Sequence, residues 1–176
     1  PLEVGHVLLK GGRSEQEQGF VGIGISQPLH AERGTGADPS LFSFNYLNPA
    51  SARTMFRQGA ADQIYLANVL STNGHNLIAP NGEPIHLNTS KISYFGHSHG
   101  GQVGSLALPF IGHLIESAIL SGTGGVLSVT LMLRDARDIN IAELITAAIE
   151  LSENEEIAPY HPVISLVQMV AEAADP

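Results

Sequence analysis

A serine lies at the centre of the segment Gly96-His97-Ser98-His99-Gly100. Small residues two positions before and two positions after a serine permit a sharp turn between a strand and a helix, which larger side chains would obstruct. The serine hydroxyl would then stand at the edge of a sheet, where a histidine base could reach it. The pattern therefore predicts nucleophilic attack on a carbonyl carbon, with Ser98 as the nucleophile.

The segments on either side of Ser98 are the ones that such a turn requires. Residues 91–95 form a β-rich run that stops at Gly96, and residues 100–108 form a run of small residues that predicts a helix. The backbone N–H of His99 would lie at the N-terminus of that helix, where negative charge on a developing oxyanion is favoured. We therefore predict that the His99 N–H is an oxyanion donor.

The side chains of the two histidines beside Ser98 could in principle act as metal ligands or as the catalytic base. A His-x-His pair could belong to a metal site, but no carboxylate is near in the sequence and the two rings need not converge at such a turn. Neither histidine suits the role of the base, because a neighbouring residue cannot easily bring its imidazole onto the serine oxygen. We interpret His97 and His99 as residues that pack in the turn or line the pocket, and we predict no metal and no organic cofactor.

Predicted strands alternate with predicted helices over the first part of the chain, which favours an α/β fold with a parallel sheet. Phe42, Phe44 and Tyr46 alternate like one face of a strand and are expected to pack. The expected elements are a buried strand at 19–26, a long ordered loop at 27–50, a helix from 51 to about 73, turns with a small hairpin at 71–90, and a strand at 115–121.

The character of the sequence changes after Gly125. Three helical segments are expected, at 127–133, 139–151 and 162–174, with no strand between them. We interpret residues 1–125 as a partial core that carries the turn at Ser98, and residues 126–176 as a helical lid or cap.

The composition excludes several classes of protein. The formal net charge is −9 and the eight Lys and Arg residues are dispersed, so no basic stripe is present to bind nucleic acid. No apolar run approaches the roughly 20 residues that a transmembrane helix needs. The absence of cysteine excludes disulfides and cysteine nucleophiles. The sequence indicates neither the compartment nor the oligomeric state.

With the turn at 96–100, Tyr94-Phe95 before it and Gly101-Gln102 after it, the chain resembles the α/β-hydrolase superfamily, most closely its bacterial lipase- or esterase-like members. The resemblance is specific over residues 91–105. It extends more loosely over Pro28-Leu-His30 with Arg33, and over Phe44-Asn-Tyr-Leu-Asn-Pro49 with Arg57-Gln58. It implies ester hydrolysis through an acyl-enzyme on Ser98, with the His99 N–H in the oxyanion hole and a lid after Gly125.

In this superfamily the triad follows the chain order serine, acid, histidine, with the last two in loops after later strands. Apart from His99 within the turn, the histidines after Ser98 are His113 and His161, and neither follows a recognisable strand. We therefore expect the acid and the base to come after Pro176. The second oxyanion donor is expected in a loop after an earlier strand, for which Gly11-Gly12 is a candidate.

The leading hypothesis is a carboxylic-ester hydrolase that acts on a small-molecule or lipid-like ester. A catalytically silent module of the same fold, which binds a ligand or partner through its pocket, is an alternative favoured by the missing base. A peptidase or thioesterase would use the same chemistry, and motif alone does not choose among them.

Overall fold

The computed structural model describes residues 21–45, 48–72, 77–78, 82, 84–133, 140–149, 151 and 155–176. Over these residues the protein combines helices with a two-stranded parallel sheet, which confirms the mixed α/β class. The parallel sheet that the sequence predicts for a partial core is small, with two strands over the described residues. Within the described ranges no helix combines the length and the apolar character needed to cross a bilayer.

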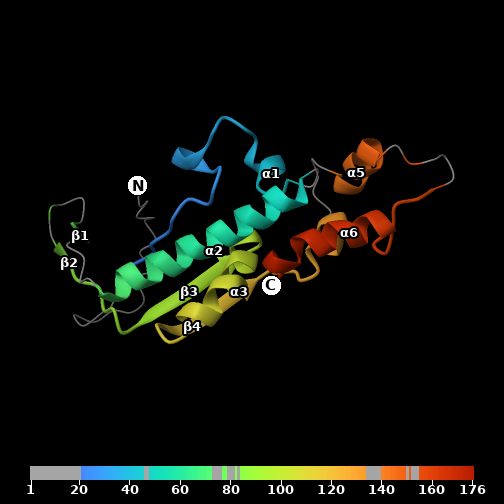
Figure 1. Ribbon diagram of the computed structural model, residues 1–176. Coiled ribbons are helices and arrows are strands. Elements are labelled where there is room, and N and C mark those ends of the chain that lie inside the picture. Colours follow the sequence, from blue (N-terminus) through green and yellow to red (C-terminus); the bar gives the residue numbers. More distant parts are fainter. Residues whose placement is uncertain are drawn as a thin grey trace, which may run out of the picture.

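The centre of the fold is a strand, helix and strand in that order (Figure 1). Strand β3 (Ile92–His97) leads into helix α3 (His99–Ile111), and strand β4 (Ile115–Ser121) then pairs in parallel with β3. All three predicted elements are confirmed, and α3 continues two residues beyond Pro109. A parallel pair needs such a crossover, and the helix provides it.

The side chain of Tyr94 holds α3 against β3. Its hydroxyl donates a hydrogen bond to the carbonyl oxygen of Gly100 at 2.8 Å, and burial raises the pKa of the phenol above its ordinary value. A Cβ added at Gly104 would lie 2.3 Å from the Tyr94 ring, and one added at Gly96 would lie 2.8 Å from it. The small residues of α3 therefore make room for an aromatic ring between the helix and the strand.

Helix α2 (Pro49–Thr72) lies along α3 and confirms the helix predicted from residue 51 (Figure 1). Asn48 precedes it, and its side-chain oxygen accepts a hydrogen bond from the Ser51 N–H at 3.1 Å, which satisfies one free donor of the first turn. Gly59 permits the close approach of the two helices, since an added Cβ would lie 3.1 Å from Val103. The buried residues of α2 are Ala52, Phe56, Gly59, Ala60, Leu66 and Ala67.

Three helices follow the sheet, as predicted: α4 (Leu127–Met132), α5 (Ile141–Ile149) and α6 (Pro162–Ala171), the last continued by the 3₁₀ helix η2 (Glu172–Ala174). The carboxylate of Asp175 accepts hydrogen bonds from the N–H groups of Val126 and Leu127 at 2.9 and 2.8 Å. These bonds cap the start of α4 from a distant part of the chain. Leu127 and Ala174 also join the core cluster that contains Phe56 and Val103, so this region packs directly on the core.

The hairpin predicted within 71–90 is confirmed by the antiparallel pair β1 (Leu77–Ile78) and β2 (Pro84–Ile85). The strand predicted at 19–26 is wrong over its described part, because residues 21–26 form no strand and Gly24 alone makes a bridge. Ile23 and Ile25 line a cleft of about 230 Å³ that residues of β3 also line.

The loop predicted at 27–50 is more structured than expected. It contains the 3₁₀ helix η1 (Ala31–Arg33) and the short helix α1 (Pro39–Phe42), and α2 already begins at Pro49. Phe42 therefore ends a helix, and the strand-like alternation expected for Phe42 and Phe44 is wrong. Tyr46 lies outside the described residues.

Candidate functional site

Ser98 occupies the turn between β3 and α3, as the sequence predicts. Its φ of 53° and ψ of −118° lie in a region that a residue with a Cβ rarely adopts. Such backbone strain persists only where surrounding interactions enforce it, and it concentrates at functional sites. Ser98 is exposed at the surface, so its hydroxyl is accessible.

Backbone hydrogen bonds hold the Ser98 turn from both sides. The Ser98 N–H donates to the carbonyl oxygen of Ser121 in β4 at 2.8 Å. The Ser98 carbonyl oxygen accepts from the N–H groups of Gly101 and Gln102 at 2.9 and 3.1 Å, in the first turn of α3. The strained residue is therefore tied at once to the sheet and to the helix.

The two glycines that flank the turn serve different purposes. A Cβ added at Gly96 would lie 2.5 Å from the carbonyl oxygen of Gly100, a backbone atom that cannot move without moving α3. A Cβ added at Gly100 would meet no atom within 4 Å, apart from its own helix and neighbours. Only the first glycine of the motif is thus required by the packing of this turn.

The two histidines beside Ser98 point into different surroundings. His97 is exposed, and its Nδ1 lies 3.2 Å from the hydroxyl oxygen of Ser121 on the neighbouring strand. The ring of His99 packs against Phe56 and Phe44, with centroids 4.7 and 5.1 Å away, and its Nε2 is buried without a hydrogen-bond partner. The interpretation that these histidines pack around the turn fits both positions.

Burial keeps the His99 ring neutral. Desolvation lowers its pKa to about 4, and the nearby His30 contributes further in the same direction. An imidazole that is neutral and enclosed by aromatic rings is unsuited to exchange protons with a substrate at neutral pH. The backbone N–H of His99, by contrast, begins helix α3 directly after Ser98, where it is available to an oxyanion.

The described residues place no triad base at Ser98. No histidine among them hydrogen-bonds the Ser98 hydroxyl. His161 caps α6 and contacts Glu155 at 3.1 Å, and His113 is exposed after α3. Asp175 serves as the cap of α4. Among the described residues, therefore, none of these groups forms a hydrogen bond with Ser98.

The loop at residues 27–31, for which the sequence predicts no specific role, lies beside the turn. Within it, Leu29 and Ala31 have φ values of 68° and 45°, which are rare for residues other than glycine. The ring of His30 between them lies 6.4 Å from that of His99, centroid to centroid. Arg33 anchors the loop by donating to the Ser26 carbonyl oxygen at 2.8 Å and pairing with Asp62 of α2. Because leucine and alanine rarely adopt positive φ, the residue types at positions 29 and 31 do not predict this backbone conformation.

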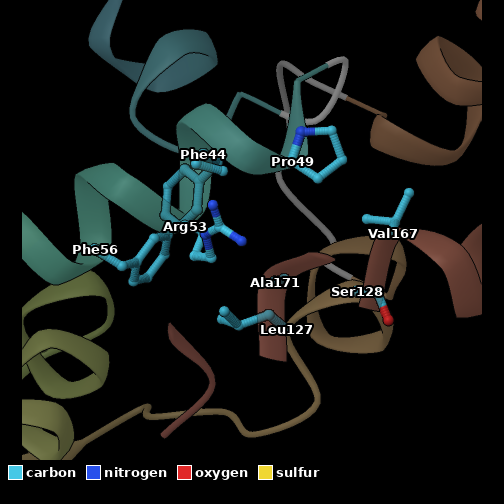
Figure 2. Close-up of a pocket in the computed structure, with 9 residues that line it drawn as sticks. Phe44, Pro49, Arg53, Phe56, Leu127, Ser128, Val167 and Ala171 are labelled. Carbon is cyan, nitrogen blue, oxygen red and sulfur yellow. The ribbon is translucent and has the colours of Figure 1, made fainter. Parts of the chain in front are cut away.

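Two cavities border the region around His99. The smaller, of about 20 Å³, lies between the start of α2 and the helices α4 and α6, with Phe44 and Phe56 on one wall and Leu127 and Ala171 on the other (Figure 2). Its volume suits about one water molecule, so we interpret it as a packing gap. The cleft beside β3 is larger and reaches Gly96, His97 and Gly100, next to the nucleophile position.

Comparison of the chain with protein-family models, with curated proteins and with solved structures finds no match. Within the part of the chain that the structure describes, no three histidine or acidic side chains are arranged to hold a metal ion. The Gly11-Gly12 pair, the candidate for the second oxyanion donor, lies outside the described residues. The inference of function therefore depends on the geometry at Ser98.

The glycine contacts predict an asymmetric response to alanine. Gly96→Ala should lower the free energy of unfolding by about 1–3 kcal/mol, since the new methyl group overpacks the turn. Gly100→Ala, the matched control, should leave that free energy unchanged or raise it by up to about 1 kcal/mol, because alanine favours a helix. Urea unfolding followed by circular dichroism measures both, and equal tolerance at the two positions would contradict the turn described above.

The buried His99 ring predicts a loss of stability in acid. Its pKa of about 4 in the folded protein lies below the roughly 6.5 expected when unfolded, so the unfolded chain binds the proton more readily. This contribution is fully present above about pH 6.5 and declines towards pH 4, by up to about 3 kcal/mol. Denaturant unfolding from pH 7 to pH 4 should show a smaller decline in His99→Phe. The exposed control His113→Phe should keep the wild-type decline, and an unchanged decline in His99→Phe would refute the prediction.

Proposed function

We propose that this chain carries the nucleophile of a serine hydrolase that acts on carboxylic esters. The Ser98 hydroxyl oxygen attacks the ester carbonyl carbon while its proton passes to a histidine base, and the alcohol then leaves. Water hydrolyses the resulting acyl-enzyme and releases the carboxylic acid. The histidine and the acid that orients it come from outside the described residues.

The observation that carries this proposal is the conformation of Ser98. A serine with positive φ, exposed at the end of a parallel strand and followed directly by a helix, is the geometry of a nucleophile elbow. A structural turn at this place would be built at lower energy with glycine, which adopts positive φ without a steric penalty. The presence of a serine, and not a glycine, at this strained and exposed position favours a chemical role.

The oxyanion hole in this proposal has two donors. The His99 N–H, at the start of α3, is the first. The loop at residues 27–31 supplies the second, and we assign it to the Leu29 N–H, which makes no hydrogen bond among the described residues. The contact between His30 and His99 supports this assignment because it keeps the loop next to the turn. We also propose that the core is of the α/β-hydrolase type and that the helices of residues 126–176 form its lid.

Labelling with a fluorophosphonate tests the proposal. The probe should label the full-length gene product, and Ser98→Ala should abolish the labelling because the nucleophilic oxygen is gone. Ser93→Ala is the matched control, since Ser93 is an exposed serine of the same strand whose hydroxyl pairs with that of Ser117.

Labelling that persists in Ser98→Ala would assign the nucleophile elsewhere. Absence of labelling in the full-length wild-type protein would reject the hydrolase and favour the silent binding module of the same fold. Comparing the hydrolysis of an alkyl ester, a peptide amide and a thioester by the unlabelled wild-type protein would then separate ester substrates from peptides and thioesters.

A further inference from the structure

We propose that the side chain of His99 is a positioning residue that joins the two halves of the oxyanion hole. This inference rests on the proposed function. It concerns the imidazole ring, whose role is separate from that of the His99 backbone N–H. The ring holds the start of α3 against the strained loop at 27–31, so that the two donor groups keep their relative positions.

The contacts of the ring support a holding role. Phe56 of α2 and Phe44 of the turn after α1 pack against it, and the centroids of these two rings lie 5.7 Å apart in an edge-to-face arrangement. His30, which belongs to the loop itself, lies on the His99 ring at a centroid distance of 6.4 Å. One side chain therefore contacts both the helix that supports the turn and the loop that faces it.

The surroundings of the ring exclude several other roles. Its Nε2 is buried without a partner, so the ring does not hold the turn through a hydrogen bond from that atom. Among the described residues the ring has no carboxylate partner and belongs to no group of three possible metal ligands. What remains is the shape of a flat ring in an aromatic enclosure, where aromatic pairs stabilise one another beyond the area that they bury.

The strained backbone of Ser98 explains why the turn needs a side chain that restrains it. A residue with φ of 53° would relax if the first turn of α3 could move. The His99 ring is attached to the residue directly after Ser98 and is enclosed on three sides, so it restrains that movement. A shift of about 1 Å in an oxyanion donor is enough to reduce a rate by about 100-fold.

Amide hydrogen exchange tests the positioning role without reference to activity. The readout is the exchange of three amides whose bonds define the turn, those of Ser98, Gly101 and Gln102. In His99→Ala these amides should exchange at least about tenfold faster than in the wild type, because the enclosure is left empty. In His99→Phe, which keeps a ring of similar shape, they should exchange close to the wild-type rate.

A control separates this local effect from general destabilisation. Ile111→Ala removes a fully buried side chain at the far end of α3, well away from His99. It should lower the free energy of unfolding without accelerating the three amides. Wild-type exchange in His99→Ala, fast exchange in His99→Phe, or equal acceleration in Ile111→Ala would each overturn the proposal.

The rate of fluorophosphonate labelling distinguishes a failure of the role proposed for the His99 ring from a failure of the proposed function. If the fluorophosphonate labels the wild type, His99→Ala should lower the maximal rate of labelling by about tenfold or more, with the half-saturating probe concentration changed less than about twofold. His99→Phe should restore the rate. An unlabelled wild type would reject the hydrolase, while the exchange experiment would still decide whether the ring holds the turn.

Discussion

The strained backbone at Ser98 is the constraint on which the rest of this structure depends. A serine with φ of 53° costs free energy that the surrounding structure must supply. The Ser98 N–H donates a hydrogen bond to β4, and its carbonyl oxygen accepts hydrogen bonds from the first turn of α3, so the residue is fixed on both sides. Tyr94, placed between Gly96 and Gly104, keeps the helix at the distance at which those bonds can form.

The packing of the surrounding helices also supports the turn at Ser98. Helix α2 brings Phe56 against the His99 ring and Gly59 against α3, and so supports the turn from the side of the helices. The Asp175 cap draws the last residues of the chain onto the start of α4, where Leu127 enters the shared core. The apolar residues and the cap therefore stabilise one packed unit around the strand that ends at Ser98.

The local part of this arrangement could be predicted from the sequence. The glycine spacing around Ser98, the β-rich run before it and the small residues after it together predict the order of strand, turn and helix. The predicted hairpin and the three helices after Gly125 are also local patterns of turn residues and apolar spacing. In each case the signal lies within a few neighbouring residues.

The remainder depends on contacts between distant residues, which local patterns do not contain. Asp175 caps Val126 across 49 positions, and nothing in the composition of either segment indicates the pairing. The apolar run at 19–26 has the composition of a strand, but a ladder also needs a partner edge, and over residues 21–26 Gly24 alone makes a bridge. The positive φ of Leu29 is similarly imposed by its surroundings.

The most direct test of this account is a crystal structure of the protein after reaction with a fluorophosphonate. The account predicts a covalent phosphonate on the Ser98 hydroxyl oxygen, with the phosphoryl oxygen about 2.7–3.1 Å from the backbone nitrogen of His99. The strained φ of Ser98 should persist in the adduct. A phosphonate on another residue, or a phosphoryl oxygen directed away from the start of α3, would contradict the central claim that this turn builds a nucleophile and its oxyanion hole.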